Sequence, residues 1–289
     1  MRDRDCELVK AAKNEKSLVT MSSFDRHRVF HIDDLSALQL GSTSKGNQQK
    51  WYCKKTDEFV KGQFYYQGKY WKDNLVEVIA SKLAEQMNLN DVSVVKQETC
   101  VVSQYDGVEV DGVCSKNFCK PGQRFVSAAR LDPTMEDRLF STRYAEERWN
   151  IVSQTIQKIT GLNYESYLAA MCLIDYLVGN EDRHLNNFGV LLGSDGFSPA
   201  PLFDFGLGLF EHDRRYEGLP FRDCIKKMQC KPFHADNQKV IDFLANQRMI
   251  DGMLPAEFDL TGVELPSPKA GSYLRNRCMH LNVDLKGVR

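Results

Sequence analysis

The pattern of apolar and polar positions changes near residue 120. Short runs rich in β-branched and aromatic residues predict strands at 29–32, 50–55, 92–95, 99–105 and 107–114. Asp106-Gly107 and Asp111-Gly112 are typical of hairpin turns. After Pro121-Gly122 the spacing becomes helical, over residues 134–159 and 163–180. A strand-rich first part and a helix-rich second part predict an α+β fold.

One amphipathic helix interrupts the predicted strands. Between residues 73 and 89 the apolar side chains recur at helical spacing, at Leu75, Val76, Ile79, Leu83 and Met87. Asp73 precedes this stripe and is the expected N-cap. Glu77 then falls within the first two turns of the helix.

Composition and charge narrow the class of protein. The chain has 289 residues, with 38 Lys and Arg against 39 Asp and Glu, so it has no cationic surplus and no direct nucleic-acid partner is expected. No apolar run approaches the roughly 18 residues that span a bilayer, and the polar N-terminus lacks the apolar core of a secretory signal. We therefore expect a cytoplasmic protein without a membrane partner, and export without a cleavable signal stays open.

The cysteines do not indicate a metal or disulfide framework. There are nine, an odd number, and none forms a C-x-x-C pair. Scattered thiols in apolar contexts are usually reduced and act as small buried hydrophobic residues.

The candidate chemistry lies in residues 179–210. The polar loop EDRHLNN follows an apolar helix and precedes the strand-like FGVLL, and a second apolar run ends at Asp204-Phe205-Gly206. Phosphoryl transfer requires a carboxylate that positions the acceptor hydroxyl and oxygen ligands that hold Mg²⁺ on the phosphates. Asp182, Asn187 and Asp204 supply these groups in that order, and the five-residue step from Asp182 to Asn187 is that of a kinase catalytic loop.

Each of these motifs alone is weak, because D-x-x-x-x-N and D-F-G both recur by chance. Their order, the 17-residue step from Asn187 to Asp204, and the flanking strand-like segments make the combination specific. The alternative is that Asp182 and Asn187 only shape a turn or cap a helix while Asp204 starts another turn.

The segment DRHLNN followed by DFG resembles the catalytic and metal-binding loops of HipA-like serine/threonine kinases, whose fold is close to that of phosphoinositide kinases. The resemblance covers residues 29–245 and includes GSTSKGNQQKWYCKK as phosphate loop and lysine strand. The chain is most similar to the short, CtkA-like members. The resemblance implies a two-lobed protein-kinase-like fold, with an N-lobe over residues 1–118, a C-lobe over residues 119–289 and ATP between them.

The resemblance also implies residue roles. Asp182 would be the catalytic residue, Asn187 and Asp204 would bind Mg²⁺, and Lys54 would hold the α- and β-phosphates while pairing with Glu77. Because Lys54 and Lys55 point to opposite faces of a strand, only one of them can enter the cleft. Lys50 lies near the same strand, and we favour Lys54.

Other residues of the motifs have open or auxiliary roles. His184 is either a neighbour of the γ-phosphate or a loop-bracing donor, and Arg183 is expected to brace the loop. We expect the hinge that binds adenine near residues 115–118. The phosphates would be cradled by backbone N–H groups of Gly41, Ser42, Thr43, Ser44, Lys45 and Gly46.

The function implied is ATP- and Mg²⁺-dependent transfer of phosphate to a serine or threonine hydroxyl of a protein that the sequence does not identify. We also expect autophosphorylation at Ser42, Thr43 or Ser44, which would switch the enzyme off. The alternatives are a lipid or small-molecule kinase, and a nucleotide-binding pseudokinase or toxin–antitoxin module. An antitoxin-like partner is a further expectation, weakened because the chain begins almost directly at the nucleotide-binding lobe, without room for the extra N-terminal subdomain of HipA.

Overall fold

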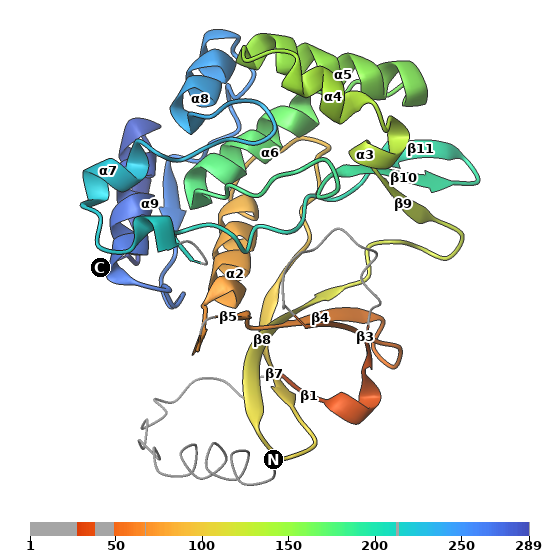
Figure 1. The fold of residues 1–289 in the computed structure, drawn as a ribbon, viewed down its shortest axis with the longest axis vertical. Helices are drawn as coiled ribbons and strands as arrows, with labels where there is room; N and C mark the ends of the chain where they lie inside the picture. Colours follow the sequence, from red (N-terminus) through yellow and green to blue (C-terminus); the bar gives the residue numbers. More distant parts are fainter. Residues whose placement is uncertain (1–27, 38–48, 67, 212–213, 289) are drawn as a thin grey trace, which may run out of the picture.

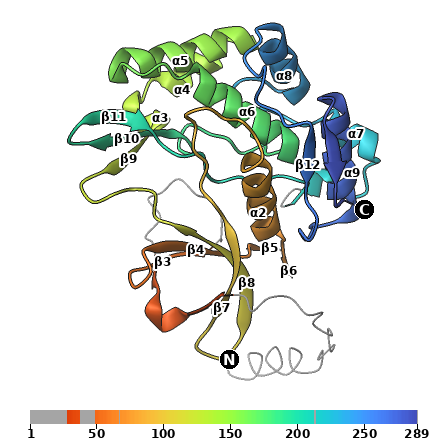
Figure 2. The ribbon, with the colours of Figure 1, turned by 180° about the vertical axis from the view of Figure 1, so that it is seen from behind.

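The computed structural model describes residues 28–37, 49–66, 68–211 and 214–288. Figures 1 and 2 show a sheet-rich half and a helix-rich half, with helix α2 (Asp73–Ala84) standing between them. No helix in the described part of the chain is long and apolar enough to cross a bilayer.

The sheet-rich half is built on one six-stranded sheet with the order β1-β7-β8-β4-β3-β2. All neighbouring strands are antiparallel except β1 and β7. The strands are β1 (Arg28–His31), β2 (Ser36–Ala37), β3 (Lys50–Cys53), β4 (Glu58–Gly62), β7 (Glu98–Ser103) and β8 (Glu109–Lys116). The sequence missed β4, which is the partner of β3 in a hairpin.

The two faces of this sheet have different environments. In β4, Glu58, Val60 and Gly62 are buried, while Phe59 and Lys61 between them are partly exposed. The Val60 face carries the small core of this half, which consists of Phe30, Trp51, Cys53, Val60, Cys100, Val102 and Cys114. Because side chains alternate along a strand, Lys61 lies on the opposite face.

Two of the predicted strand and turn assignments are wrong. Asp111-Gly112 lies inside β8, where Gly112 pairs with Gly62. Glycine is needed there because a Cβ would come within 2.5 Å of the Lys61 carbonyl oxygen. Residues 92–95 form only an isolated bridge between Val94 and Leu202. The predicted turn at Asp106-Gly107 is confirmed, since it joins β7 to β8.

Helix α2 is predicted correctly, but its cap is not. Asp73 is the first residue of the helix, and its carboxylate accepts a hydrogen bond from the Phe64 backbone N–H at 3.0 Å instead of capping α2. Val76, Ile79 and Leu83 are fully buried and belong to the large core of the helical half. The helix is therefore anchored to the C-terminal helices by its apolar face.

The helical half surrounds α6 (Glu165–Val178), which is buried from Tyr167 to Val178. An apolar sequence on all sides suits such a central helix. The region predicted as one helix over 134–159 is two helices, α4 (Met135–Phe140) and α5 (Ala145–Thr160). The remaining helices are α3 (Ala128–Leu131), α7 (Phe221–Ile225), α8 (Asn237–Asn246) and α9 (Pro268–His280).

Short strands complete the fold. β9 (Arg124–Ser127), β10 (Gly189–Gly193) and β11 (Gly196–Pro199) form a three-stranded antiparallel sheet. Two small pairs are β5 (Tyr65–Tyr66) with β6 (Lys69–Tyr70), and β12 (Glu257–Asp259) with β13 (Asp284–Lys286). The segment between α6 and β10 contains the loop that the sequence marks as catalytic.

Candidate active site

A lysine and two carboxylates meet where the large sheet faces α2. The Lys61 ammonium of β4 lies 2.7 Å from Glu77 Oε1 and 2.7 Å from Asp204 Oδ1. The second Glu77 oxygen accepts a hydrogen bond from the Phe205 backbone N–H at 3.0 Å. Glu77 is thus bound on one oxygen to the sheet and on the other to the Asp204-Phe205-Gly206 segment, so three distant parts of the chain are fixed at one point.

The predicted pairing of Lys54 with Glu77 is wrong, because Lys61 makes that contact. Lys54 and Lys55 lie exposed in the turn that joins β3 to β4, and Lys55 pairs with Asp34 at 2.5 Å. The sequence signal that could have identified Lys61 is the β-type pair Phe59-Val60 directly after the turn, which predicts a second strand returning across β3.

The charges at this point stabilise one another. Burial alone would lower the pKa of Lys61, yet Asp204 and Glu77 hold that pKa well above its usual value. Burial would likewise raise the pKa of Asp204, but Lys61, Lys50 and Arg183 hold it well below the usual range. Lys50 shares the face of Lys61, since the two residues pair across β3 and β4. The site is therefore an ionised cluster that can bind polyanions and cations.

The loop that carries Asp182 begins at a fixed turn after α6. Gly179 has a φ of 64°, and a Cβ there would come within 2.6 Å of Met228 Cε. Left-handed backbone and close packing both favour glycine at this helix end. Asn180 then donates from Nδ2 to Asp175 at 2.8 Å and to the Asp204 carbonyl at 3.5 Å. The end of α6 is in this way attached to both candidate loops.

Arg183 holds the two loops together, as the sequence predicts for its bracing role. Its guanidinium makes a bidentate pair with Asp175 at 2.8 and 2.9 Å. The remaining nitrogen donates to the carbonyls of Asn187 at 2.9 Å and Phe203 at 2.5 Å, and the guanidinium lies over the Phe205 ring. One Arg183 nitrogen therefore joins the backbone at Asn187 to the backbone at Phe203, the residue before Asp204.

Replacing Arg183 with Met should lower the free energy of unfolding by about 3–5 kcal/mol, because it leaves a buried carboxylate without its cation. Arg183 is 0% exposed and Asp175 is 2% exposed. Urea denaturation measures the loss. Arg248→Met is the matched control, since its pair with Asp251 is mostly exposed and should contribute about 1 kcal/mol or less. Equal losses in the two variants would contradict the bracing role.

Side chains of the Asp182 loop are oriented by hydrogen bonds within the loop. Asn187 donates from Nδ2 to the Asp182 carbonyl at 3.1 Å, which directs its amide oxygen away from that carbonyl. The Asp182 carboxylate is about two-fifths exposed and faces His184 Nε2 at 3.9 Å and Lys231 Nζ at 3.6 Å. Asp182 is therefore accessible to a second substrate, while Asn187 presents an oxygen of the type that binds Mg²⁺.

The Asn187 and Asp204 pair fits a magnesium ion held largely by phosphate. No group of three His, Cys, Asp or Glu residues with metal-site geometry occurs in the described part of the chain. A self-contained protein site would need such a group, but Mg²⁺ on nucleotide phosphates commonly uses one or two carboxylates and keeps several waters. The two residues would supply an amide oxygen and the Asp204 carboxylate.

The segment around Asp204 has an unusual backbone. Asp204 has a φ of 64°, in the left-handed region that non-glycine residues seldom adopt. Gly208 packs so closely on α6 that a Cβ would come within 2.5 Å of the Val178 carbonyl oxygen, to which Leu209 N–H donates at 2.7 Å. This contact fixes the segment that follows Asp204 against the end of α6. Backbone strain of this kind is frequent at functional sites.

Two predicted parts of the nucleotide site have different outcomes. The loop of Gly41, Ser42, Thr43, Ser44, Lys45 and Gly46 lies outside the described residues, between β2 and β3. The expected hinge near residues 115–118 is the end of β8 and the start of the connection to β9. Phe118 stacks on Phe203 at 5.5 Å between ring centroids, next to Asp204. The adenine contact itself stays a prediction.

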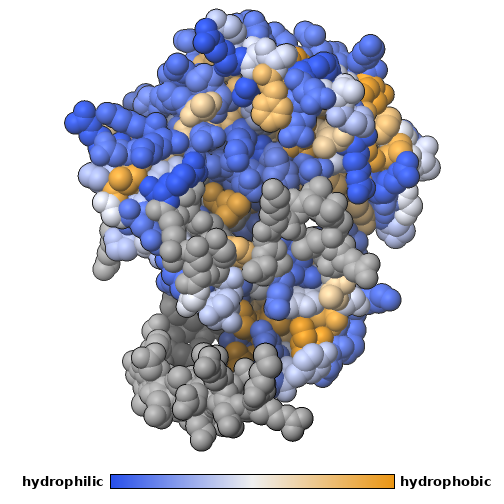
Figure 3. Space-filling model, in the orientation of Figure 1, coloured by the Kyte–Doolittle hydropathy of each residue, from blue (hydrophilic) through white to orange (hydrophobic). Residues whose placement is uncertain are grey.

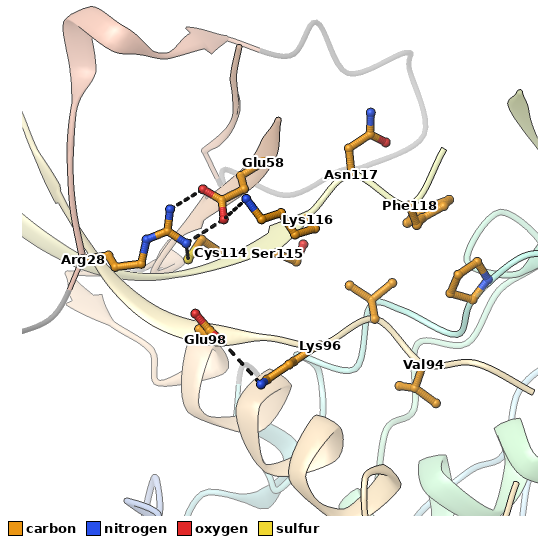
Figure 4. A pocket seen from close by; sticks show the side chains of 12 residues that line it. Arg28, Glu58, Val94, Lys96, Glu98, Cys114, Ser115, Lys116, Asn117 and Phe118 are labelled. Atoms are coloured by element: carbon orange, nitrogen blue, oxygen red, sulfur yellow. Dashed lines mark hydrogen bonds and ion pairs between the residues drawn. The ribbon is translucent and has the colours of Figure 1, made fainter. Parts of the chain in front are cut away.

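A cavity of about 270 Å³ beside the connection from β8 to β9 is separate from the Lys61 cluster. Figure 4 shows Arg28, Glu58 and Lys116 on one side of it and Lys96 with Glu98 on the other. Glu58 and Lys61 are three positions apart in β4, so they point to opposite faces of the sheet. The cavity therefore does not open on the Lys61 cluster.

The fold of the chain has a counterpart among solved structures. The crystal structure of the Helicobacter pylori proinflammatory kinase CtkA superposes with a TM-score of 0.53 at 16% identity, covering 88% of this chain and 93% of that one. The chain has the fold of the CtkA kinase. The expected α+β, HipA-like kinase fold is thereby confirmed.

A second structural comparison is weaker. A Shewanella oneidensis structure of HipA, HipB and operator DNA gives a TM-score of 0.43 at 16% identity, and the match covers 95% of this chain but 62% of that one. No protein-family model matches the sequence, and neither does any curated protein. The CtkA likeness supports the fold alone.

Proposed function

We propose that the chain is an ATP- and Mg²⁺-dependent protein kinase that phosphorylates serine or threonine. The observation that carries the proposal is the contact of Lys61 with both Glu77 and Asp204. A lysine paired with a helix glutamate beside a D-F-G aspartate is the arrangement that orients nucleotide phosphates in protein kinases. The cluster lies on the kinase-like fold and next to a loop that exposes Asp182.

Each residue has one task in this proposal. Lys61 binds the α- and β-phosphates, and Glu77 fixes the direction of its ammonium group. Asn187 and Asp204 would hold Mg²⁺, which neutralises phosphate charge when bound. Asp182 orients the acceptor hydroxyl and accepts its proton. Lys61 thus takes the role that the sequence assigned to Lys54.

A protein acceptor is favoured over a lipid by the surface. On the face seen in Figure 3, apolar side chains of the described part lie in small separate areas among polar ones, which gives no broad surface for a bilayer. The near-zero net charge also gives no general attraction to anionic lipid. The antitoxin-like partner stays a prediction.

The acceptor class is tested with ATP labelled in the γ-phosphate and Mg²⁺. Separate reactions would contain a generic protein such as casein, vesicles of phosphatidylinositol, or an aminoglycoside. Label on serine or threonine of protein is the expected result. Label only on lipid or drug would support the corresponding alternative, and nucleotide binding without any labelled product would support a pseudokinase.

The phosphate loop provides a further test of regulation. We expect ATP-dependent phosphate on Ser42, Thr43 or Ser44, and weaker ATP binding by the modified protein, since phosphoserine adds about −1.5 to −2 charge beside the nucleotide phosphates. Mass spectrometry after incubation with ATP measures the site, with Asp182→Asn as control. Absence of phosphate on all three residues, or unchanged ATP affinity in the modified protein, would contradict the switch.

A further inference from the structure

Lys231 stands beside Asp182, the residue proposed to orient the acceptor hydroxyl. Its ammonium is 3.6 Å from Asp182 Oδ1, and its side chain is 49% exposed. Both residues line a cavity of about 150 Å³, together with Leu207 and Glu211 of the segment after Asp204. The lysine follows α7 and lies 49 positions after the aspartate in sequence, so neither of the motifs that mark the site includes it.

The backbone that carries Lys231 is held on both sides. Cys230 exchanges backbone hydrogen bonds with His234 at 2.9 and 2.8 Å, and Cys230 and Phe233 are buried. Phe233 packs on Trp149 of α5 at 5.3 Å between ring centroids. A long side chain that starts from a fixed turn and reaches a candidate catalytic carboxylate is positioned, unlike an ordinary solvated surface lysine.

Stability does not explain this pair. Asp182 is 39% exposed and Lys231 is 49% exposed, and ion pairs this open contribute about 1 kcal/mol or less to folding. The carboxylate of the neighbouring Glu181 has other partners, because it accepts hydrogen bonds from Tyr216 Oη at 2.5 Å and from the Gln229 backbone N–H at 3.0 Å. Lys231 therefore faces the cavity with its charge directed at Asp182.

We propose that Lys231 is a further catalytic residue, which binds the phosphoryl group in transit from the acceptor side. In the reaction, the acceptor oxygen bonds to the γ-phosphorus, the bond from that phosphorus to the bridging oxygen breaks with its electron pair leaving on ADP, and Asp182 takes the hydroxyl proton. Charge spreads over the oxygens of the transferred group at this moment. Lys61 is held by Glu77 and Asp204, so Lys231 supplies the cation at the opposite end.

The inference rests on the proposed kinase function and is tested with three variants of the full chain. Lys231→Met removes the charge, Lys231→Arg keeps it, and Lys239→Met on α8 is an exposed control. For each protein one measures single-turnover transfer, Mg²⁺–ATP affinity, and affinity for Mg²⁺–ADP with and without aluminium fluoride, which mimics the group in transit. Thermal melting checks that the variants fold.

Lys231→Met should transfer about 100-fold more slowly, the effect of losing one donor to transition-state charge, while its affinity for Mg²⁺–ATP stays nearly unchanged. The gain in ADP affinity that aluminium fluoride produces should also fall about 100-fold in Lys231→Met. Lys231→Arg should recover much of the transfer rate and much of the fluoride effect. Normal transfer by Lys231→Met, or lost transfer with a normal fluoride effect, overturns this inference alone. A wild-type chain without any transfer overturns the proposed function as well.

Discussion

Asp182→Asn should lower the rate of phosphoryl transfer by roughly 100- to 10,000-fold, the usual contribution of a positioned acid or base. Asn keeps the size of the side chain but cannot accept the hydroxyl proton. Affinity for Mg²⁺–ATP should stay nearly unchanged, because Asp182 is separate from the Lys61 cluster and faces Lys231 and His184. Single-turnover kinetics and nucleotide titration measure the two quantities.

Asp195→Asn is the matched control for this variant. Asp195 is exposed in the turn between β10 and β11 and hydrogen-bonds Ser194, so its replacement should leave both quantities as in the wild type. Near-native transfer by Asp182→Asn would show that the catalytic assignment is wrong. A large loss of nucleotide affinity in that variant would place Asp182 at the phosphates instead.

Lys61→Ala should reduce transfer by roughly 100- to 1,000-fold and weaken nucleotide binding. The substitution also leaves Glu77 and Asp204 without their shared cation. Removal of one partner of a fully buried pair costs about 3–5 kcal/mol, and we expect about 2 kcal/mol here because Asp204 is 25% exposed. Transfer assays, ATP titration and urea denaturation measure the three effects.

Lys54→Ala is the control that separates the two candidate lysines. Lys54 is exposed in the β3–β4 turn, so its loss should change folding stability by no more than about 0.5 kcal/mol and should leave transfer unaffected. A larger loss of activity in Lys54→Ala than in Lys61→Ala would restore the sequence-based assignment. Equal effects would argue that neither lysine binds the phosphates alone.

The polar loops could be predicted from sequence because their chemistry is local. Asp182 and Asn187 are five residues apart, and the loop follows a helix whose apolar sequence identifies it. Arg183 was expected to brace the loop, but its bidentate partner Asp175 lies within α6 among apolar residues. Nothing in a helical pattern distinguishes a buried, paired aspartate from one on a solvated face.

The lysine was misplaced because a strand pattern of period two does not reveal pairing. Lys54 follows the aromatic run of β3 directly, whereas Lys61 lies on the next strand and reaches Glu77 only after the hairpin has turned back. The turn is short and begins directly after the aromatic run, so Lys54 and Lys55 look in sequence like the end of the same strand. Tertiary pairing therefore decided which lysine enters the site.

The turn and the helix cap predicted from local sequence were wrong where packing with distant residues favoured another arrangement. Asp73 has the residue type of an N-cap, but its carboxylate accepts a hydrogen bond from the Phe64 backbone N–H. Asp111-Gly112 has the composition of a hairpin turn, but Gly112 is required inside β8 by the close approach of the Lys61 carbonyl. Asp73 begins α2, which carries Glu77, and Gly112 lies against β4, which carries Lys61.

Transfer of the γ-phosphoryl group of ATP by this chain is best tested by a balance of products. The purified wild-type protein is incubated with γ-labelled ATP and Mg²⁺ in the presence of a protein acceptor. We expect ADP and an equal amount of label in serine or threonine esters. No ADP, or ADP matched only by free phosphate, would contradict it.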